Sequence, residues 1–481
     1  MTKFHVIPLT ILVGYLENHD IIKLTKIEKY LRDQIYNNVR PTFLIETDCM
    51  AYTMLKLFKN PKFTTNSKSI FTHDTEILNK IIKLNIEATS DKIILCKNLT
   101  HLMIKTYSEV IQQLTNLKSL YIRDTTALDM CFTSLTNLTY FSADTCHFLT
   151  DSAISELINL QSLELIYCSL ITNDALLNLT KLNNLKITIN NNITHTGLLH
   201  LTALTTLDLI NTPNIHNDVF LYCKNLQFFT LCYNTQLTHK GINILTNLKS
   251  LVINDPIDII SMIFSTGLTR LEIVDEYFRQ GRNNYSMIKL LGLRELSLSS
   301  AEDYDHCVCQ FTNLTSLSIR GISDGEPMTN GGLRMLTNLK NLELFDMENI
   351  NDEGICTLTK LTSLSVVAEQ VRGKIIGHGL LNLQLKKLDI PNHNKITNEV
   401  IAKQTNLTSL NISSCPKITG DALSDLVKLK HLEIRDTLDI GEFIDLSSLV
   451  VRAQIISVEK YKRYYERGIS VQFIRSYFFL R

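Results

Sequence analysis

The chain has 481 residues, and its 48 basic residues are balanced by 48 acidic residues. This balance excludes the strong net field that recruits nucleic acid or an anionic membrane surface. No apolar run reaches the roughly 18 residues that a membrane-spanning helix needs. Eleven cysteines, an odd number scattered over the whole length, show no disulfide framework. We therefore expect neither nucleic acid nor a membrane among the partners of this chain.

Residues 1–40 have helical rather than repetitive spacing. Apolar residues first recur at Ile11, Leu12, Tyr15 and Leu16, and Asp20 then stands where an N-cap opens a further helix. An apolar run behind Lys3 is typical of a secretory signal, but Pro8 and the absence of a small-residue cleavage site argue against one. The sequence thus predicts a small N-terminal helical segment.

Residues 41–80 form a less regular connector and N-terminal cap. Phe43–Ile45 has the composition of a strand, and Met50–Phe58 has helical spacing. The segment leads into a regular pattern that begins at Ile81.

A leucine phrase recurs at a constant interval through residues 81–457. Its clearest copies are Leu160-x-x-Leu163-x-Leu165 and Leu182-x-x-Leu185-x-Ile187, and in this part of the chain the step is 22 residues. Shorter steps of 18 residues precede this block, and an irregular stretch follows Leu268. Counted from Ile81, the chain contains eighteen units.

The alternation within each phrase predicts a short strand with one apolar face. Leu163 and Leu165 point to the same side, and Glu164 points to the other side. One unit cannot bury its apolar face alone, so the units must stack and share a core. A period of 20–29 residues with this core resembles the leucine-rich repeat family. The resemblance implies an α/β solenoid, a curved horseshoe with a parallel sheet on its concave face.

Two further positions of the repeat are expected to be structural. Three residues after each LxL, an inward side chain is predicted to bond the backbone of the turn, at Cys146, Cys168, Asn190, Thr212, Asn234 and Cys415. The eight N-x-S/T sequons, for example at Asn98 and Asn137, mostly arise from the TNL phrase that opens a strand. They are explained by the repeat rather than by glycosylation.

Residues 458–481 break the rhythm and are rich in tyrosine and phenylalanine. They predict a C-terminal cap over the last repeat. Their excess of basic residues leaves open a contact patch as the alternative.

The residues before the repeats resemble the second half of the F-box motif. The resemblance rests on Tyr15-Leu16, three polar residues, Asp20-Ile21-Ile22-Lys23-Leu24 and Ile27. It implies that residues 1–40 bind a Skp-family adaptor. The implied adaptor-binding residues are Pro8, Leu12, Leu16, Ile21, Leu24 and Ile27. The alternative is that these helices only close the open end of the repeat core.

The strand residues beside the LxL leucines are expected to face the concave surface, where curved solenoids bind their partners. Large apolar side chains gather there in the middle units, and acidic ones follow. The candidate partner-binding residues are Tyr140, Ile166, Tyr167, Ile210, Phe228, Tyr233, Asp255 and Asp275. Aromatic and aliphatic anchors of this kind supply most of the affinity of protein interfaces. Strand propensity alone also favours such residues.

The motifs of known catalytic and metal sites are missing from the sequence: there is no HExxH, no phosphate-binding GxxxxGK[ST] and no pair of CxxC motifs. We therefore expect no enzyme activity of the chain's own, no metal and no cofactor.

The F-box and repeat resemblances together imply a substrate-recognition subunit of a cullin-RING (SCF-type) ubiquitin ligase. The expected partners are a Skp-family adaptor and a target protein, with the chain a monomer within the larger complex, in the cytoplasm or also in the nucleus. Two alternatives stay open. One is a repeat scaffold unrelated to ubiquitination, and the other is an adhesive protein, since the 22-residue step also resembles internalin repeats.

Overall fold

The computed structural model describes residues 42–45, 48–58, 61–66, 75–87, 91–105, 108–124, 132–254, 267–274, 290–299, 308–321, 328–347, 349–367, 375–435, 446–452 and 470–473. The chain divides into two compact units, Met1–Leu226 and Gln227–Arg481. The predicted adaptor-binding residues Pro8, Leu12, Leu16, Ile21, Leu24 and Ile27 lie outside the described residues, as does the whole predicted segment 1–40.

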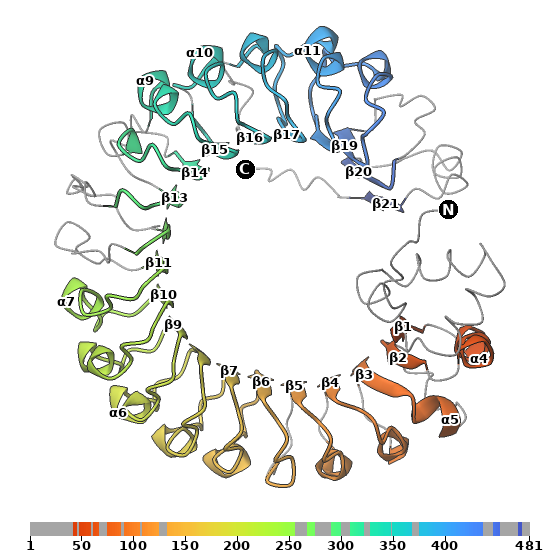
Figure 1. Ribbon diagram of the computed structural model, residues 1–481, viewed down its shortest axis with the longest axis vertical. Helices are drawn as coiled ribbons and strands as arrows, with labels where there is room; N and C mark the ends of the chain where they lie inside the picture. Colours follow the sequence, from red (N-terminus) through yellow and green to blue (C-terminus); the bar gives the residue numbers. More distant parts are fainter. Residues whose placement is uncertain are drawn as a thin grey trace, which may run out of the picture. The chain divides into compact units, whose positions relative to one another are not determined.

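Unit 1 contains a parallel sheet in which each strand pairs with the next one along the chain. In Figure 1 these strands lie on the inner side of the unit, and its short helices lie on the outer side. The strands are β1 (Thr42–Leu44), β2 (Lys62–Thr65), β3 (Ile81–Ile86), β4 (His101–Ile104), β5 (Ser119–Arg123), β6 (Tyr140–Asp144), β7 (Ser162–Ile166), β8 (Asn184–Thr188) and β9 (Thr206–Ile210). The α and 3-10 helices are α4 (Asp48–Leu57), α5 (Thr75–Leu78), η2 (Asp91–Leu95), η3 (Glu109–Gln113), η4 (Asp151–Ala153), η5 (Asn173–Ala175), α6 (His195–Leu198) and η6 (Asn217–Leu221).

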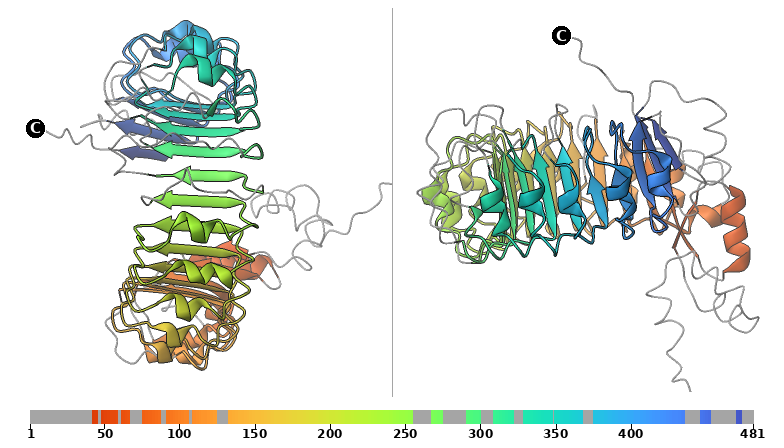
Figure 2. Two further views of the ribbon diagram at one scale, coloured as in Figure 1. Left: turned by 90° about the vertical axis from the view of Figure 1, so that its left-hand side faces the viewer. Right: turned by 90° about the horizontal axis from the view of Figure 1, so that it is seen from above.

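Unit 2 repeats this arrangement, and its strands also pair in parallel in chain order. Figure 2 shows the strands of each unit stacked side by side with a common direction. The strands are β10 (Phe228–Cys232), β11 (Ser250–Asn254), β12 (Arg270–Ile273), β13 (Glu295–Ser299), β14 (Ser316–Arg320), β15 (Asn341–Phe345), β16 (Ser363–Val367), β17 (Lys387–Asp389), β18 (Ser409–Asn411), β19 (His431–Arg435), β20 (Ser448–Arg452) and β21 (Ser470–Phe473). The helices are α7 (His239–Ile242), α9 (Asn330–Arg334), α10 (Asp352–Ile355), η7 (His378–Leu380), α11 (Asn398–Ala402) and η8 (Gly420–Leu423).

The leucine phrase builds the core, as the alternation predicts. Leu163 and Leu165 of β7 are fully buried, and in register with them Leu185 and Ile187 of β8 are fully buried as well. The residue between the two leucines, Glu164, stays partly exposed on the opposite face. Each repeat therefore contributes two buried side chains to the core, and they stack on the equivalent side chains of the next repeat.

On the outer side of several repeats a short helix is capped by a polar side chain, at Thr172, Thr194, Thr329 and Asn351. Thr194 stands before α6 in an extended conformation, and its hydroxyl accepts a hydrogen bond from the backbone N–H of Thr196. Such N-caps satisfy donors that a helix leaves unpaired. These helices have only one turn, because little of a 22-residue unit remains after the strand and its two turns.

The inward residue three places after LxL bonds backbone groups at Cys146, Cys168, Asn190, Asn234 and Cys415, as predicted for these positions. The Asn190 side-chain amide donates to the carbonyl oxygens of Cys168 and Ile171, and its Oδ1 accepts from the N–H groups of Asn192 and Ile193. Asn190 is 2% exposed, so these bonds satisfy backbone groups that water cannot reach. The Cys168 thiol reaches the Ala143 carbonyl oxygen in the same way, at 3.5 Å.

These features define the leucine-rich repeat fold: α/β units with a buried LxxLxL core, a parallel sheet on one side and short helices on the other. The sheet also takes in β1 and β2 within the predicted connector and β21 within the predicted C-terminal cap. Among the residues that the structure describes, no helix has the length and apolar character needed to cross a bilayer.

Candidate functional site

The residue that follows several strands has a left-handed backbone. In unit 1 this holds for Asp124, Thr145, Tyr167, Ile189 and Asn211, with φ between 52° and 58°. The conformation turns the backbone N–H toward the neighbouring repeat. The Tyr167 N–H donates to the Thr188 carbonyl oxygen at 3.0 Å, and the Ile189 N–H donates to the Ile210 carbonyl oxygen at 2.8 Å. The sheet ladder is therefore extended by one bond beyond the strand end.

An apolar group of side chains lies at these strand ends. We define the apolar ledge of unit 1 as Ile166, Tyr167, Ile189 and Ile210. Ile166 and Ile210 close β7 and β9 and stand in register through Thr188 of β8. Tyr167 is 46% exposed, and the three isoleucines are partly exposed. The carboxyl ends of these strands thus present apolar side chains to solvent over three consecutive repeats.

Tyr140, which was predicted in the same surface, stands elsewhere on the sheet. It is the first residue of β6, and it pairs in register with Ser162 at the start of β7. Four residues of extended chain, about 13 Å, separate the start of such a strand from its end. Burial first, and then the Glu164 carboxylate, raise the pKa of the Tyr140 phenol. The structure therefore brings Ile166, Tyr167 and Ile210 together and leaves Tyr140 apart from them.

A polar cluster borders the ledge on the side of β6. The Asp144 carboxylate accepts hydrogen bonds from the Tyr121 hydroxyl at 3.0 Å and from the Thr145 hydroxyl at 2.9 Å, and it lies 3.3 Å from the Arg123 guanidinium. Burial, together with the bond to Asp144, raises the pKa of Tyr121 to about 12. Because three neighbours hold this carboxylate in place, the cluster is a fixed polar border beside the apolar ledge and not a reactive centre.

The middle of the same sheet face carries a row of alternating charge. Glu164, Lys186 and Asp208 occupy equivalent positions of three neighbouring strands. The Ser142 hydroxyl donates to the Glu164 carboxylate at 3.3 Å. The row is polar and partly exposed, so it supplies complementary contacts beside the ledge rather than apolar anchors.

The remaining predicted partner-binding residues belong to unit 2. Phe228 opens β10 and is 46% exposed, whereas Tyr233 follows the end of β10 with φ 57° and is 49% exposed. The two side chains therefore stand at opposite ends of one strand. Asp255 and Asp275 lie outside the described residues.

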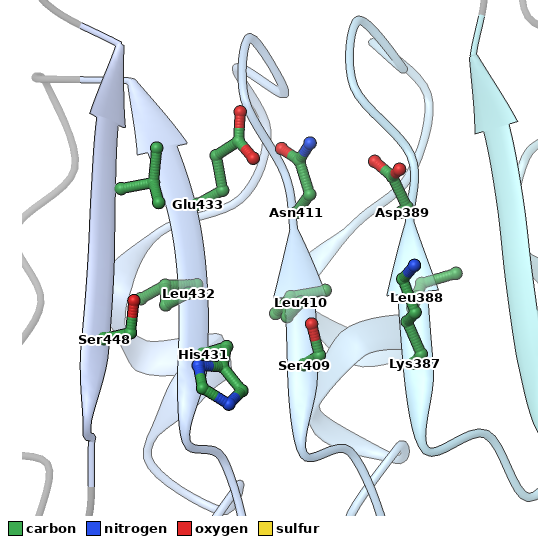
Figure 3. Close-up of a pocket in the computed structure, with 11 residues that line it drawn as sticks. Lys387, Leu388, Asp389, Ser409, Leu410, Asn411, His431, Leu432, Glu433 and Ser448 are labelled. Carbon is green, nitrogen blue, oxygen red and sulfur yellow. The ribbon is translucent and has the colours of Figure 1, made fainter. Parts of the chain in front are cut away.

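Unit 2 also has a pocket on its sheet face, about 210 Å³ in volume, across β17 to β20. Two levels of side chains line it, as Figure 3 shows. One level holds Lys387, Ser409, His431 and Ser448, and the next holds Asp389, Asn411, Glu433 and Val450.

Sequence reasoning missed Ile189, Asp389 and Glu433. Ile189 occupies the same repeat position as Tyr167, directly after the strand, so the period itself was the available signal. Asp389 ends β17 and Glu433 stands in the middle of β19, well beyond Asp255 and Asp275, the acidic residues that the sequence predicted in the partner-binding surface. Within the described part of the chain, no three His, Cys, Asp or Glu side chains are grouped as metal ligands.

Comparison with known proteins gives neither a matching family model nor a match among curated proteins. Among solved structures, an internalin from Listeria monocytogenes is similar at 21% identity and TM-score 0.34, covering 75% of this chain and 88% of its own. A leucine-rich repeat protein of Leptospira interrogans has 20% identity and TM-score 0.47, covering 76% and 99%. The Toll–Spatzle complex of Drosophila has 14% identity and TM-score 0.43, covering 90% and 68%. These TM-scores and identities are low, so the three proteins carry no argument about partners.

Proposed function

We propose that this chain is a non-catalytic protein-binding scaffold whose target docks on the apolar ledge of unit 1. The observation that carries the proposal is the exposure of Tyr167 beside the partly exposed Ile166 and Ile189, at the ends of the neighbouring strands β7 and β8. Tyrosine and isoleucine at the centre of an interface act as anchors, while the polar residues around them exclude water. The Asp144 cluster and the row from Glu164 to Asp208 form such a rim.

The rigidity of the ledge supports this role. Tyr167 and Ile189 are attached to backbone that is hydrogen-bonded to the next repeat, so their orientation is set before any partner arrives. Binding then loses little backbone freedom, and anchors that are already positioned contribute more of their contact energy to affinity.

A pair of tyrosine variants tests the ledge. Tyr167 and Tyr222 are 46% and 47% exposed, but Tyr222 follows η6 on the helical side of unit 1. Affinity purification with the full chain should recover the same target from the parent and from Tyr222→Ser, whereas Tyr167→Ser should lose most of it. Equal recovery by the two variants would place the target elsewhere.

The finer proposal is that the target is presented for ubiquitination. It rests on the F-box-like residues from Tyr15 to Ile27, which stand ahead of the repeats in the sequence. In this proposal residues 1–40 bind a Skp-family adaptor of a cullin-RING ligase, and the chain works in the cytoplasm or nucleus. The chemistry then belongs to the other subunits.

A binding assay with purified Skp-family adaptor tests this step. The full chain should retain the adaptor, and a chain lacking residues 1–40 should not. Retention by both would assign the contact to the repeats. Retention by neither would remove the ubiquitin-ligase proposal and leave the scaffold proposal standing, since the tyrosine variants decide that one separately.

A further inference from the structure

The pocket of unit 2 separates its charges into two rows. Lys387 and His431 stand on either side of Ser409, while Asp389 and Glu433 stand on either side of Asn411 (Figure 3). Neighbouring strands lie about 4.8 Å apart, so Lys387 and His431 bracket a space of roughly 10 Å, and Asp389 and Glu433 bracket another. A counter-charge in that space meets both members of the pair.

Asp389, Lys387 and His431 keep capacity for such a ligand. Of the Asp389 carboxylate oxygens, Oδ2 accepts the Ser365 hydroxyl at 3.0 Å, but Oδ1 is buried and has no hydrogen-bond partner among the described residues. The terminal torsion of aspartate is soft, so a small rotation of the carboxylate offers an oxygen to the pocket. Within the part of the chain that the structure describes, Lys387 and His431 form no ion pair.

The spacing of the rows limits the ligand. Residues two apart on a strand are separated by about 6.6 Å, so the ligand needs an anionic group and a cationic group joined by a short chain. Arginine and lysine with a free α-carboxylate have this form. Their carboxylate would meet Lys387 and His431, and their side-chain cation would meet Asp389 and Glu433.

The geometry points to a binding site for a basic amino acid with a free carboxylate, either free arginine or lysine or the C-terminal arginine or lysine of a polypeptide. Its volume of about 210 Å³ is below the roughly 300–1,000 Å³ of pockets for drug-sized ligands. One side chain with its carboxylate is the occupant that this size admits. The site is separate from the apolar ledge and does not depend on the proposed function.

Calorimetric titration of the full chain tests the site. The probe is the tetrapeptide Ala-Ala-Ala-Arg with a free C-terminus, and the comparators are the same peptide with a C-terminal amide and Ala-Ala-Ala-Glu. The free-acid arginine peptide should bind saturably. The amide and the glutamate peptide should each bind at least about tenfold more weakly, because each lacks one of the two charge-assisted contacts.

Variants assign the contacts. Lys387→Gln should weaken the free-acid peptide about tenfold but leave the amide unchanged, since the amide has no carboxylate to lose. Asp389→Asn should weaken both peptides. Glu343→Gln, on the same face of unit 2 at β15, is the matched control and should change neither. Thermal unfolding of each variant establishes that it is folded.

A further arm separates the two sources of the ligand. Free arginine that binds as tightly as the peptide would make the ligand an amino acid, and tighter binding of the peptide would make it a polypeptide terminus. Equal binding of acid and amide, equal effects of Lys387→Gln on both, or no saturable binding of any probe would overturn the inference.

Discussion

Ile189 adopts a left-handed backbone, φ 54°, that β-branched residues rarely occupy. For an ordinary residue this conformation costs about 1–2 kcal/mol. The same position one repeat later is Asn211, a residue type that tolerates it. The repeat needs the conformation for its hydrogen bond to the next strand, but it does not need isoleucine. A strained apolar residue on the ledge is what selection for binding would leave in place.

Exchanging these two residues measures the strain. Ile189→Asn should raise the free energy of unfolding by about 1 kcal/mol, and Asn211→Ile should lower it by a similar amount. Urea unfolding of both variants checks the prediction. A loss of stability in Ile189→Asn would mean that the packing of the isoleucine side chain stabilises the fold by more than its backbone strain costs.

The assignment of strand faces is tested at β7. Leu163 is fully buried and Glu164 is partly exposed. Leu163→Asp buries an uncompensated charge and should abolish folding or cost more than about 4 kcal/mol, while Glu164→Lys should cost less than about 1 kcal/mol. Circular dichroism and urea unfolding distinguish the two. Similar losses from both would contradict the assignment.

The Tyr121 phenol makes the free energy of unfolding depend on pH in the alkaline range. Its pKa rises from 10.0 to about 12 on folding, so the neutral form is favoured in the folded state. The corresponding stabilisation is complete below pH 10 and is lost as the pH rises from 10 toward 12. In Tyr121→Phe the fall in unfolding free energy between about pH 9 and pH 11 should be smaller than in the parent. An equal fall would show that other groups account for it.

Neighbouring repeats are joined on the helical side by side-chain clamps. The Asn173 Oδ1 accepts the Thr194 N–H at 2.9 Å, and the Asn330 Oδ1 accepts the Asn351 N–H at 3.0 Å. The clamp requires close approach of the next one-turn helix. A Cβ on Gly197 would collide with the Asn173 side chain, and one on Gly354 would lie 2.5 Å from the Asn330 Oδ1. Gly197 and Gly354, in the one-turn helices α6 and α10, are therefore required by packing.

Two glycine variants separate this packing from helix propensity. Replacing a helical glycine by alanine normally stabilises by up to about 1 kcal/mol. Gly331→Ala should show this gain or no change, because the nearest atom to the added Cβ, the Thr329 hydroxyl oxygen, is 3.3 Å away. Gly197→Ala should instead lose about 1–3 kcal/mol through overpacking. Thermal unfolding measures both, and a gain at Gly197 would refute the clamp.

Asparagines three residues ahead of a strand form a second set of contacts between repeats. The Asn137 side-chain amide donates to the Thr115 carbonyl oxygen at 2.9 Å, and the Asn98 amide donates to the Asn79 carbonyl oxygen at 2.7 Å. The amide nitrogen is the atom that N-glycosylation modifies. In these two sequons it is already used by the fold, which supports their interpretation as products of the repeat.

At the scale of the whole molecule, the regular leucine phrase made the fold predictable. Each LxL is a local pattern, and a fixed period forces neighbouring copies into register, so the buried face and the inward Asn190 followed from sequence. The ledge followed only in part. Ile166, Tyr167 and Ile189 could all be placed from the repeat period, but the left-handed backbone at Tyr167 and Ile189 goes with hydrogen bonds to the next repeat that no local pattern encodes.

The pocket of unit 2 was harder to foresee. Its four ionisable residues come from β17 and β19, whose equivalent positions Lys387 and His431 lie 44 residues apart in sequence. Each is unremarkable within its own repeat, because Lys387, His431, Asp389 and Glu433 are ordinary strand residues on a solvated face. Only the strand register places Lys387 and His431 on both sides of Ser409, and Asp389 and Glu433 on both sides of Asn411. Residue type therefore predicted the scaffold, whereas the arrangement of its surface required the three-dimensional register.

Site-directed photo-crosslinking in cells is the most direct test of the proposal that the ledge binds a protein. A photo-reactive phenylalanine analogue replaces Tyr167 in one chain and the equally exposed Tyr222 in another. The proposal predicts a defined crosslinked protein from position 167 that is missing from position 222. Crosslinks of equal yield and identity from both positions, or from position 222 alone, would contradict it.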